Sequence, residues 1–281
     1  MQKKIIQNLY FCKKLFRMPE GPEVKLTSDF LNNHFDNEGI TKVVPLTNYF
    51  KTKYSTVIND LNDKLIDMRI NSFTIGKKTY IPLAGNHFYQ YHLGMTGYWS
   101  RNITKHSHFK LSSNNTELYF CDIRKFGNHC IIAGSDINLR NSLFDPLRKD
   151  YDINLHYEHL IDNIGKRRNI CNILLDQNFF PGIGNYLKSE ILYISELHPD
   201  AKWGQLSKKN IFCLLKNSKS IVNASYQNGG AELKDFRNPN KKSSFNLAVY
   251  AKKFDPKGNP VESILTKDNR RTWFSPKVQK L

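Results

Sequence analysis

Paired cysteines and long apolar runs are both missing from this chain of 281 residues. Its five cysteines, at positions 12, 121, 130, 171 and 213, form no Cys-x-x-Cys pair, so the sequence predicts neither a disulfide framework nor a sequence-local zinc site. No apolar run reaches the roughly 20 residues that a membrane-spanning helix needs, and we expect no membrane partner. The chain is long enough for two domains with cores of their own.

Acidic residues are scarce. The 25 Asp and Glu residues face 42 Lys and Arg residues, which gives a formal net charge of +17. Residues 1–17 hold five of the basic residues and no acid, and removing those five charges from +17 leaves +12 on the remainder. A body this basic favours a polyanion as partner, most simply nucleic acid.

Residues 18–24, Met-Pro-Glu-Gly-Pro-Glu-Val, resemble a protein start that lies inside the sequence. If Met18 were removed, Pro19 would carry a free secondary amine beside the carboxyl of Glu20, which places a nucleophile next to an acid. An α-amino group has a pKa of roughly 8, so a useful neutral fraction exists near pH 7. Inside the chain the same nitrogen is a planar amide that cannot attack. The alternative interpretation is a Pro/Glu loop before a helix.

Residues 1–17 also have two interpretations. Ile5, Leu9, Cys12 and Phe16 fall near one helical face among basic and polar residues, as in an organelle-targeting presequence. The segment is short and poor in serine for that role. We favour the other interpretation, an upstream start codon that is little used or wrongly assigned.

The pattern of the remaining chain predicts an α+β fold, in which an antiparallel β-sandwich with flanking helices precedes a helical domain. We divide the chain into a leader (1–17), an N-terminal catalytic β-sandwich domain (18–145), a linker (146–165), a helical DNA-binding domain (166–244) and a small β appendage (245–281). Within these segments we predict helices over 24–35, 166–180, 184–195 and 207–228, short strands between about 40 and 135, a hairpin turn at 85–86 and two short strands in 247–281.

A Pro-Gly-x-Gly-Asn turn joins two predicted helices over residues 174–186. Its glycines allow close backbone approach, and Asn185 opens a helix whose free N–H groups can hold a phosphate. Taken with the Met-Pro-Glu opening, this arrangement resembles the helix–two-turn–helix of the formamidopyrimidine-DNA glycosylase/endonuclease VIII family. The resemblance runs from Met18 to the C-terminus with its motifs in the same order.

Two loops of the β domain also resemble that family. An enzyme that acts on a base inside a duplex must extrude the base and fill the hole. By resemblance, residues 92–97 supply Met95 as the inserted side chain, and residues 122–127 supply Arg124 for the orphaned partner base and Phe126 as a wedge. Outside such motifs, Met and Phe at these positions would be ordinary core residues.

The resemblance further implies a set of phosphate-binding residues. These are Lys77, His92, Asn185 and Arg270, although an alternative count back from His92 places the lysine at Lys78. Without the family frame, Arg270 would be taken for a solvated surface arginine.

The tail departs from the common family pattern. Most members hold a C-terminal β-hairpin finger with four cysteines around zinc. Here the matching positions carry Lys257, Pro260, Ser275 and Val278, so we expect a zincless finger, no metal and no cofactor. The resemblance also implies that residues 236–246 form the loop that covers the flipped base.

These observations predict a monomeric, bifunctional enzyme that acts on double-stranded DNA containing damaged bases or abasic sites. The resemblance implies glycosylase activity towards oxidised bases and AP-lyase activity, with Pro19 as nucleophile, Glu20 as acid and Glu23 in support. The preferred lesion stays open between oxidised purines and oxidised pyrimidines. One alternative is a non-catalytic reader of damaged DNA, if Pro19 stays internal, and another is a basic RNA- or ribosome-associated protein.

Overall fold

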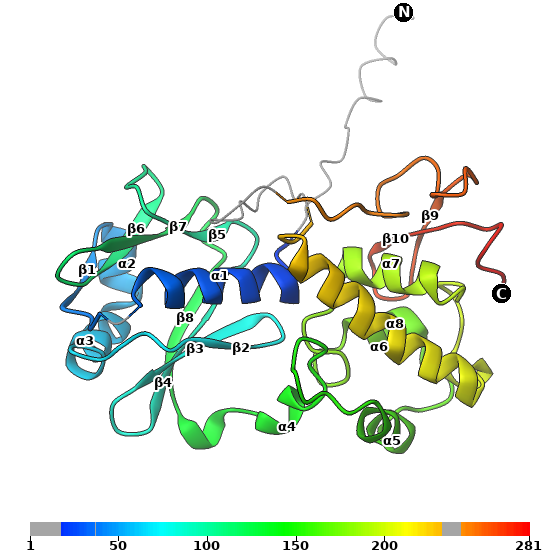
Figure 1. The fold of residues 1–281 in the computed structure, drawn as a ribbon, viewed down its shortest axis with the longest axis horizontal. Coiled ribbons are helices and arrows are strands. Elements are labelled where there is room, and N and C mark those ends of the chain that lie inside the picture. Colours follow the sequence, from blue (N-terminus) through cyan, green and yellow to red (C-terminus); the bar gives the residue numbers. More distant parts are fainter. Residues whose placement is uncertain (1–17, 37, 232–242) are drawn as a thin grey trace, which may run out of the picture.

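The computed structural model describes residues 18–36, 38–231 and 243–281. The described chain forms two lobes, and helix α1 (Gly21–His34) runs from one into the other (Figure 1). Helix α1 contacts strands of the first lobe and helix α8 of the second. The leader 1–17 and most of the predicted base-covering loop 236–246 lie outside the described residues.

The N-terminal lobe is built from two antiparallel sheets of four strands each. The first sheet has the order β1–β6–β7–β5, and the second has the order β2–β3–β4–β8. The strands are β1 (Lys42–Pro45), β2 (Phe73–Ile75), β3 (Lys78–Leu83), β4 (His87–His92), β5 (Gly97–Ser100), β6 (Ser107–Ser112), β7 (Glu117–Asp122) and β8 (Asn128–Ala133).

Aromatic side chains fill the space between these two sheets. Tyr89 of the second sheet and Trp99, Phe109 and Phe120 of the first are fully buried in one cluster. Each such side chain contributes roughly 1.5–3 kcal/mol or more through burial. The predicted hairpin turn is confirmed between β3 and β4, where residues 85 and 86 both have positive φ, 71° and 57°, which Gly and Asn adopt more readily than other residues.

Two helices interrupt the segment where only strands were predicted. Helices α2 (Asn48–Lys53) and α3 (Ser55–Lys64) follow β1 and pack on the sheets. Thr47 caps α2 by accepting a hydrogen bond from the N–H of Phe50, which is itself buried. The sequence prediction is wrong here because these helices are short and mostly polar.

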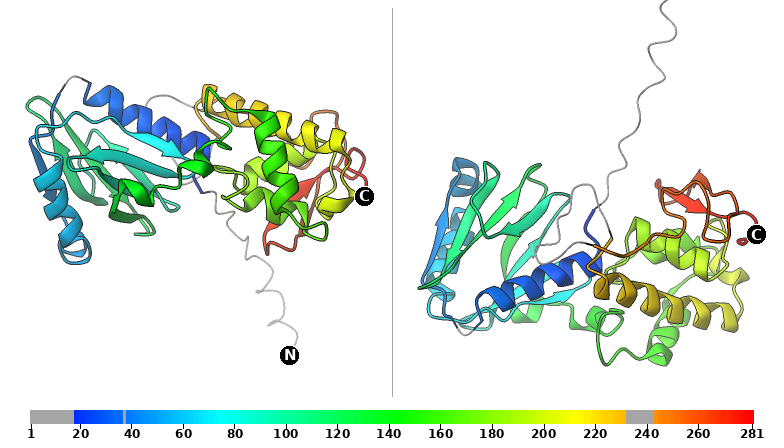
Figure 2. Two further views of the ribbon diagram at one scale, coloured as in Figure 1. Left: turned by 90° about the horizontal axis from the view of Figure 1, so that it is seen from below. Right: turned by 45° about the horizontal axis from the view of Figure 1, so that its top comes forward.

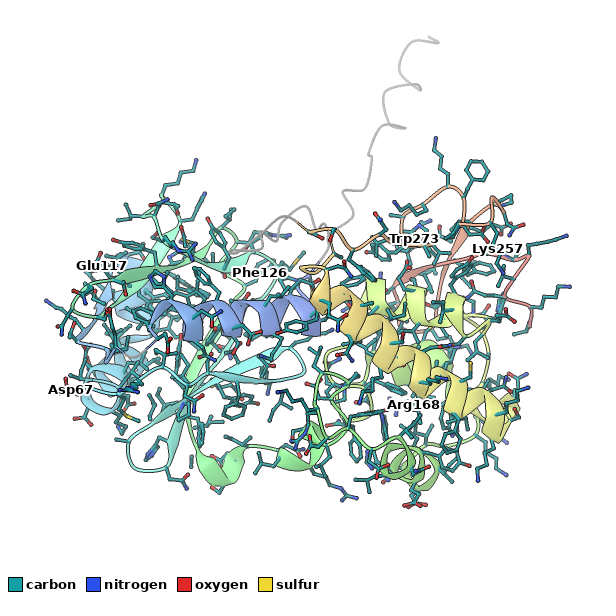
Figure 3. All side chains as sticks on the ribbon, in the orientation of Figure 1. Asp67, Glu117, Phe126, Arg168, Lys257 and Trp273 are labelled. Carbon is teal, nitrogen blue, oxygen red and sulfur yellow. The ribbon has the colours of Figure 1, made fainter. Side chains whose placement is uncertain are left out.

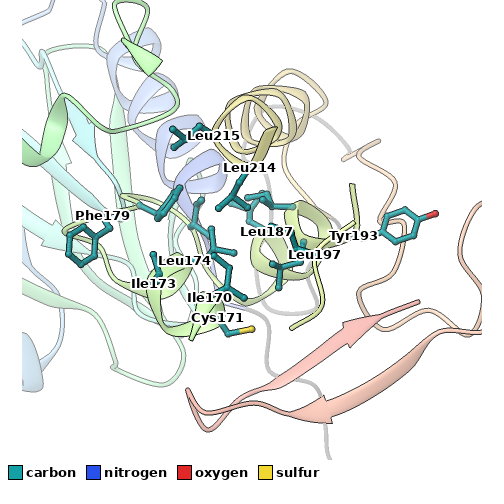
Figure 4. Close-up of a cluster of buried hydrophobic side chains, with 14 of the residues drawn as sticks. Ile170, Cys171, Ile173, Leu174, Phe179, Leu187, Tyr193, Leu197, Leu214 and Leu215 are labelled. Atoms are coloured by element: carbon teal, nitrogen blue, oxygen red, sulfur yellow. The ribbon is translucent and has the colours of Figure 1, made fainter. Parts of the chain in front are cut away.

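The C-terminal lobe packs helices around a second apolar core (Figure 4). Its helices are α5 (Ile153–Asn163), α6 (Ile170–Leu175), α7 (Asn185–Ile194) and α8 (Lys208–Gln227), preceded by the short α4 (Leu139–Ser142), with 3₁₀ turns η1 (Gly134–Asp136) and η2 (Trp203–Gln205). The helices predicted over 184–195 and 207–228 are confirmed as α7 and α8. The helix predicted over 166–180 shortens to α6, which Asn169 caps at its start.

The predicted linker 146–165 is largely a helix. Helix α5 occupies residues 153–163, with Asp152 accepting hydrogen bonds from the N–H groups of Asn154 and Leu155. Leu160 belongs to the core of the C-terminal lobe. The many polar residues of this segment face outward, which explains why it resembled a linker in the sequence.

The chain ends in an antiparallel hairpin of β9 (Glu262–Leu265) and β10 (Arg271–Phe274), and this confirms the two predicted strands. Strand β10 packs against α7, and Trp273 and Phe274 are buried (Figure 2). The hairpin, the two sheets and the helical lobe together agree with the predicted α+β architecture.

None of the helices in the described ranges has both the length and the apolar character needed to cross a membrane.

Candidate active site and nucleic-acid interface

A cavity of about 220 Å³ opens where the two lobes meet the finger hairpin. It is formed by the start of the described chain, the β2–β3 turn, the start of α7 and the C-terminal segment. Its lining residues are Met18, Glu20, Lys77, Gly184, Asn185, Tyr186, Tyr250, Arg270, Arg271 and Trp273. Four of the predicted site residues, far apart in sequence, therefore share one cavity. Pro19 is buried between two of its lining residues.

The Glu20 carboxylate sits on the N-terminus of α7. Its Oε2 accepts hydrogen bonds from the N–H groups of Gly184 at 2.7 Å and Leu187 at 3.2 Å, and its Oε1 accepts one from Tyr186 at 2.9 Å. These N–H groups are the free donors that begin every helix, and an anion satisfies them. The prediction that they hold a phosphate is therefore wrong for these three donors, because an acid of the chain itself occupies them.

Glycines allow this close approach. A Cβ on Gly184 would lie 2.3 Å from the carboxyl carbon of Glu20. Gly21 donates its N–H to the carbonyl of Gly182 at 2.8 Å, and a Cβ on Gly76 would lie 2.8 Å from the nitrogen of Gly182. The β2–β3 turn, the chain start and the turn before α7 thus touch backbone to backbone at the cavity.

Burial sets the protonation of the two central groups. Desolvation raises the pKa of Glu20, while the positive charge of Lys77 and the three helix N–H groups oppose the rise. Desolvation also lowers the pKa of Lys77, with Glu20 opposing and Arg270 reinforcing the shift. A carboxyl that keeps its proton towards neutral pH can act as an acid.

Glu23 lies one turn further along α1 and supports Glu20 from behind. Its Oε2 accepts a hydrogen bond from the backbone N–H of Glu20 at 2.8 Å. Its Oε1 accepts from the Tyr186 hydroxyl at 2.9 Å and from the N–H of Ala231 at 2.8 Å. Burial and the charge of Glu20 raise the pKa of Glu23 to about 7. Glu23 therefore links the acid, α7 and the segment that leads into residues 232–242.

Asn185 connects the start of α7 to the finger. Its Nδ2 donates to the carbonyl of Arg271 at 3.1 Å, whereas its buried Oδ1 has no partner among the described residues. A phosphate accepts hydrogen bonds and donates none, so Oδ1 is not suited to bind one. The phosphate-binding role of Asn185 stays a prediction.

Two basic residues, Lys77 and Arg270, line this cavity together. They also line a neighbouring polar cavity of about 370 Å³, together with Arg168 and Asn172. Lys78, the alternative lysine, is exposed at the start of β3 and lines neither cavity. Of the two lysines between which the sequence left a choice, Lys77 is the one that lines the cavities, and its role in binding phosphate stays a prediction.

His92 ends β4 and pairs in register with Lys78. Its Nδ1 accepts a hydrogen bond from the N–H of Gly94 at 3.0 Å. Burial lowers the pKa of His92, and the charges of Lys77 and Lys78 lower it further. The neutral ring with Nδ1 as acceptor carries its proton on Nε2, and that N–H can donate to an anion.

Met95, Arg124 and Phe126 come together outside the cavity. The Arg124 guanidinium donates to the Met95 sulfur at 3.5 Å and lies over the Phe126 ring at 4.5 Å from its centroid. Phe126 is 51% exposed, a large apolar side chain facing solvent. In Figure 3, Phe126 lies above α1, whereas Trp273 lies to the right of that helix, on the C-terminal lobe. The core-packing interpretation of Phe126 is excluded.

Two residues that hold these loops were missed by the sequence analysis. The Asp122 carboxylate accepts hydrogen bonds from the N–H groups of Arg124 at 3.2 Å and Gly127 at 2.7 Å. It also accepts from the Thr96 hydroxyl at 2.5 Å, which joins the two loops. Asp122 is the last residue of β7 (Glu117–Asp122), two residues before Arg124. This position is the one sequence signal that could have identified it.

The finger offers no zinc ligands at the positions where most family members carry cysteine. Lys257, Pro260, Ser275 and Val278 do not fit the ion, because zinc sites in proteins use Cys, His or carboxylate ligands. In the ranges that the structure describes, no group of three or more His, Cys, Asp or Glu residues could hold a metal. Hydrogen bonds organise the turns instead. Asp255 accepts from the N–H groups of Lys257 and Asn259, and Gln279 bridges Ser275 and Leu197.

Comparison with known proteins shows the family of this chain. A model of the formamidopyrimidine-DNA glycosylase N-terminal domain matches residues 18–129, and a model of the H2TH domain of the same enzymes matches residues 144–237. The chain belongs to the formamidopyrimidine-DNA glycosylase family. Family membership identifies it as a DNA glycosylase, an enzyme of DNA repair, and confirms the resemblance seen in the sequence.

Individual relatives extend over nearly the whole chain. A formamidopyrimidine-DNA glycosylase of Rickettsia bellii is 30% identical over 272 residues, covering 92% of this chain and 97% of the relative. One from Legionella pneumophila is 27% identical, covering 93% and 98%. Two solved structures of 23% identity have the same fold. MutM bound to DNA with carbocyclic 8-oxo-G has a TM-score of 0.78, and the Lactococcus lactis enzyme with N7-benzyl-Fapy-dG DNA has 0.79; each covers 94% of this chain and 100% of its own.

Proposed function

We propose that this glycosylase removes oxidised bases from double-stranded DNA and then cleaves the strand through a Schiff base on the Pro19 amine. The observation that carries the proposal is the position of Glu20. Its carboxyl is buried, has a raised pKa and lines a cavity together with Lys77 and Arg270. Met18 lines the same cavity, so loss of Met18 would open the Pro19 nitrogen towards it.

The proposed chemistry needs only groups of this chain. The free Pro19 nitrogen attacks C1′ of the flipped nucleotide and the bond from C1′ to the base breaks, with the base taking up the proton that the Pro19 nitrogen loses. Glu20 gives its proton to the ring oxygen as the bond from C1′ to that oxygen breaks, which leaves a Schiff base between Pro19 and C1′. The resulting Schiff base acidifies the C2′ proton. Loss of that proton expels the 3′-phosphate by β-elimination, and δ-elimination then expels the 5′-phosphate and leaves a one-nucleotide gap. The positive nitrogen is the electron sink, so the proposal requires no cofactor.

Phosphate contacts would hold the strand before this chemistry begins. Lys77 and Arg270 supply two positive charges at the cavity, and neutral His92 offers an Nε2–H donor near Lys77. Such contacts position the DNA without reading its sequence. Met95, Arg124 and Phe126 would fill the space that the flipped nucleotide leaves.

We also propose that the finger works without zinc. The hydrogen bonds of Asp255 and Gln279 support this because they close the same turns that paired ligands would otherwise hold. Metal analysis of the purified chain should find less than one zinc per ten molecules, and a stoichiometric zinc that survives dialysis would refute the zincless finger.

Excision and strand cleavage on defined duplexes test the function. One duplex contains 8-oxoguanine, one an oxidised pyrimidine, one an abasic site and one no lesion. With the chain starting at Pro19, we expect release of a modified base and a gap bounded by two phosphates. Release of the base without strand cleavage would refute the proposed lyase activity. Binding to the damaged duplexes without any product would favour the non-catalytic reader, and equal binding to undamaged DNA and RNA would favour a general nucleic-acid-binding protein.

A further inference from the structure

Lys188 of α7 and Asp268 of the finger form an ion pair that is almost closed to solvent. Nζ and Oδ2 are 2.5 Å apart, and the two side chains are 0% and 6% exposed. In every other ion pair of the described residues, both side chains are at least 24% exposed. Neither residue lines the main cavity.

The second oxygen of Asp268 holds the turn that carries Arg270. Oδ1 accepts hydrogen bonds from the Thr266 hydroxyl at 2.5 Å and from the backbone N–H of Arg270 at 3.2 Å. Thr266 closes the turn with a further bond from its N–H to the carbonyl of Arg270 at 3.0 Å, and the same carbonyl is the alternative acceptor for the hydroxyl proton, with the oxygens 2.9 Å apart. The backbone of Arg270 is therefore attached to α7 through Asp268 and Lys188.

The Arg270 side chain itself is not held in this way. It is exposed, and its guanidinium makes no hydrogen bond or ion pair within the described part of the chain. The position of its charge over the cavity thus depends on how firmly its backbone is anchored. Lys188 follows Asn185 by three residues and so lies on the same face of α7, the face that also bonds Arg271.

Hydroxyl and thiol groups surround the pair, and Asp268 also lines the neighbouring polar cavity together with Lys77 and Arg270. Cys171 lies beside the pair, and burial raises the pKa of its thiol to about 11, so the thiol carries no charge at neutral pH. Figure 4 shows the Cys171 sulfur turned towards the finger hairpin. Moving two charges into such surroundings costs roughly what their attraction returns, so a buried pair adds little net stability and can instead fix geometry.

We propose that Lys188 and Asp268 are positioning residues that hold the Arg270 guanidinium at the DNA phosphates. This inference rests on the proposed function, in which Arg270 binds the backbone beside the lesion. Removing the pair should therefore weaken DNA binding as much as removing the Arg270 side chain does. Combining the two changes should weaken binding no further.

The test is a mutant cycle with Lys188→Met/Asp268→Asn and Arg270→Ala in the full chain. Asn at 268 keeps an oxygen for Thr266 and for the N–H of Arg270, so the turn stays closed while its link to α7 is lost. The readouts are the dissociation constant for a duplex with a tetrahydrofuran abasic-site analogue and the dependence of log K on log salt. A double change of the surface pair Lys110 and Glu117, K110M/E117Q, is the matched control.

We expect Arg270→Ala to weaken binding about tenfold and to reduce the salt slope by about one. The pair variant should show the same loss and the same slope, Arg270→Ala should then add less than twofold to it, and the control should change neither quantity. Full additivity, or a native slope in the pair variant, would overturn the inference. An Arg270→Ala protein that binds as the wild type does would instead refute the phosphate clamp of the proposed function.

A second variant covers the case in which the pair variant does not fold. Thr266→Val keeps the ion pair and removes the hydroxyl that bonds Asp268 or, alternatively, the Arg270 carbonyl. We expect a smaller loss of affinity that again disappears in the Arg270→Ala background. A loss that persists there would count against the inference.

Discussion

The Glu20 carboxyl combines burial with three helix N–H donors, and these act on its proton in opposite directions. Desolvation favours the neutral acid, whereas the N–H groups favour the anion that remains after the proton has moved. Burial therefore extends the protonated form of Glu20 to higher pH, and the N–H groups stabilise the carboxylate that proton transfer leaves behind. That is the behaviour required of an acid that opens a sugar ring.

Replacement of this acid gives the first prediction. Because the pKa of Glu20 is raised, its protonated form persists to a higher pH and is lost as pH rises through that pKa. The single-turnover rate of base excision should therefore have an alkaline limb that falls as Glu20 loses its proton, and an acid limb that rises as the Pro19 amine becomes neutral. Glu20→Gln should lower the rate by about 10²–10⁴-fold and remove the alkaline limb. Glu158→Gln, a change of an exposed acid on α5, is the control and should leave the profile intact. A Glu20→Gln enzyme with the native profile would exclude Glu20 as the acid.

Arg124 gives a prediction about selectivity. Its guanidinium stands between Met95 and Phe126, where an orphaned base would lie, and a good contact from Arg to a base edge contributes about 1–3 kcal/mol of discrimination. Arg124→Ala should bring the excision rates opposite the four bases to within a few fold of each other. Lys125→Ala, in the same loop, should keep their ratios. Selectivity retained by Arg124→Ala would mean that another residue reads the partner base.

At the scale of elements, α7 connects the parts of the site. Its first N–H groups bind Glu20, and side chains of the same first turn, Asn185 and Lys188, bond the finger. Helix α1 supplies Glu20 and Glu23 from the other side. The geometry of the acid therefore depends on the contact between α1 and the start of α7.

Gly184→Ala tests that dependence. The backbone of Gly184 has φ of −127°, which any residue adopts, so the substitution acts through its Cβ alone. That Cβ would lie 2.3 Å from the Glu20 carboxyl carbon, and Glu20 cannot retreat without losing its N–H donors. We expect about a 10²-fold loss of excision rate with a loss of stability of roughly 1 kcal/mol. Gly165→Ala, where a Cβ meets nothing within 4 Å, is the control. A native excision rate in Gly184→Ala would show that excision does not need the contact between the Glu20 carboxyl and the start of α7.

The sequence predicted the elements whose signals are local. The apolar spacing of α7 and α8 and the Gly-Asn hairpin are visible in single segments, and all three were confirmed. Helices α2 and α5 were missed because tertiary contacts stabilise them more than their own sequence does. The seat of Glu20 joins residues 164 or more positions apart, and no local pattern records such a contact. The ion pair between Lys188 and Asp268 was not predicted for the same reason, although both residues lie within segments that the family resemblance covered.

At the scale of the whole molecule, the two lobes and the finger each contribute one function to a single surface. The β lobe carries the exposed Phe126 and its partners, the helical lobe binds the acid, and the finger brings Arg270 to the cavity. The whole chain carries a formal net charge of +17, which favours a polyanion as its partner. The proposed chemistry depends on one bond, because Pro19 would be a nucleophile only if the Met18–Pro19 peptide bond has been removed.

Borohydride trapping on duplex DNA with an abasic site tests this claim most directly. The chain starting at Pro19 is compared with residues 1–281, and the adduct is located by peptide mapping. The account predicts a covalent adduct on Pro19 from the shorter chain and none from the longer one. Equal adducts from both chains, mapped to a lysine such as Lys77, would contradict the terminal-amine mechanism, and no adduct from either would leave a protein that binds lesions without cleaving them.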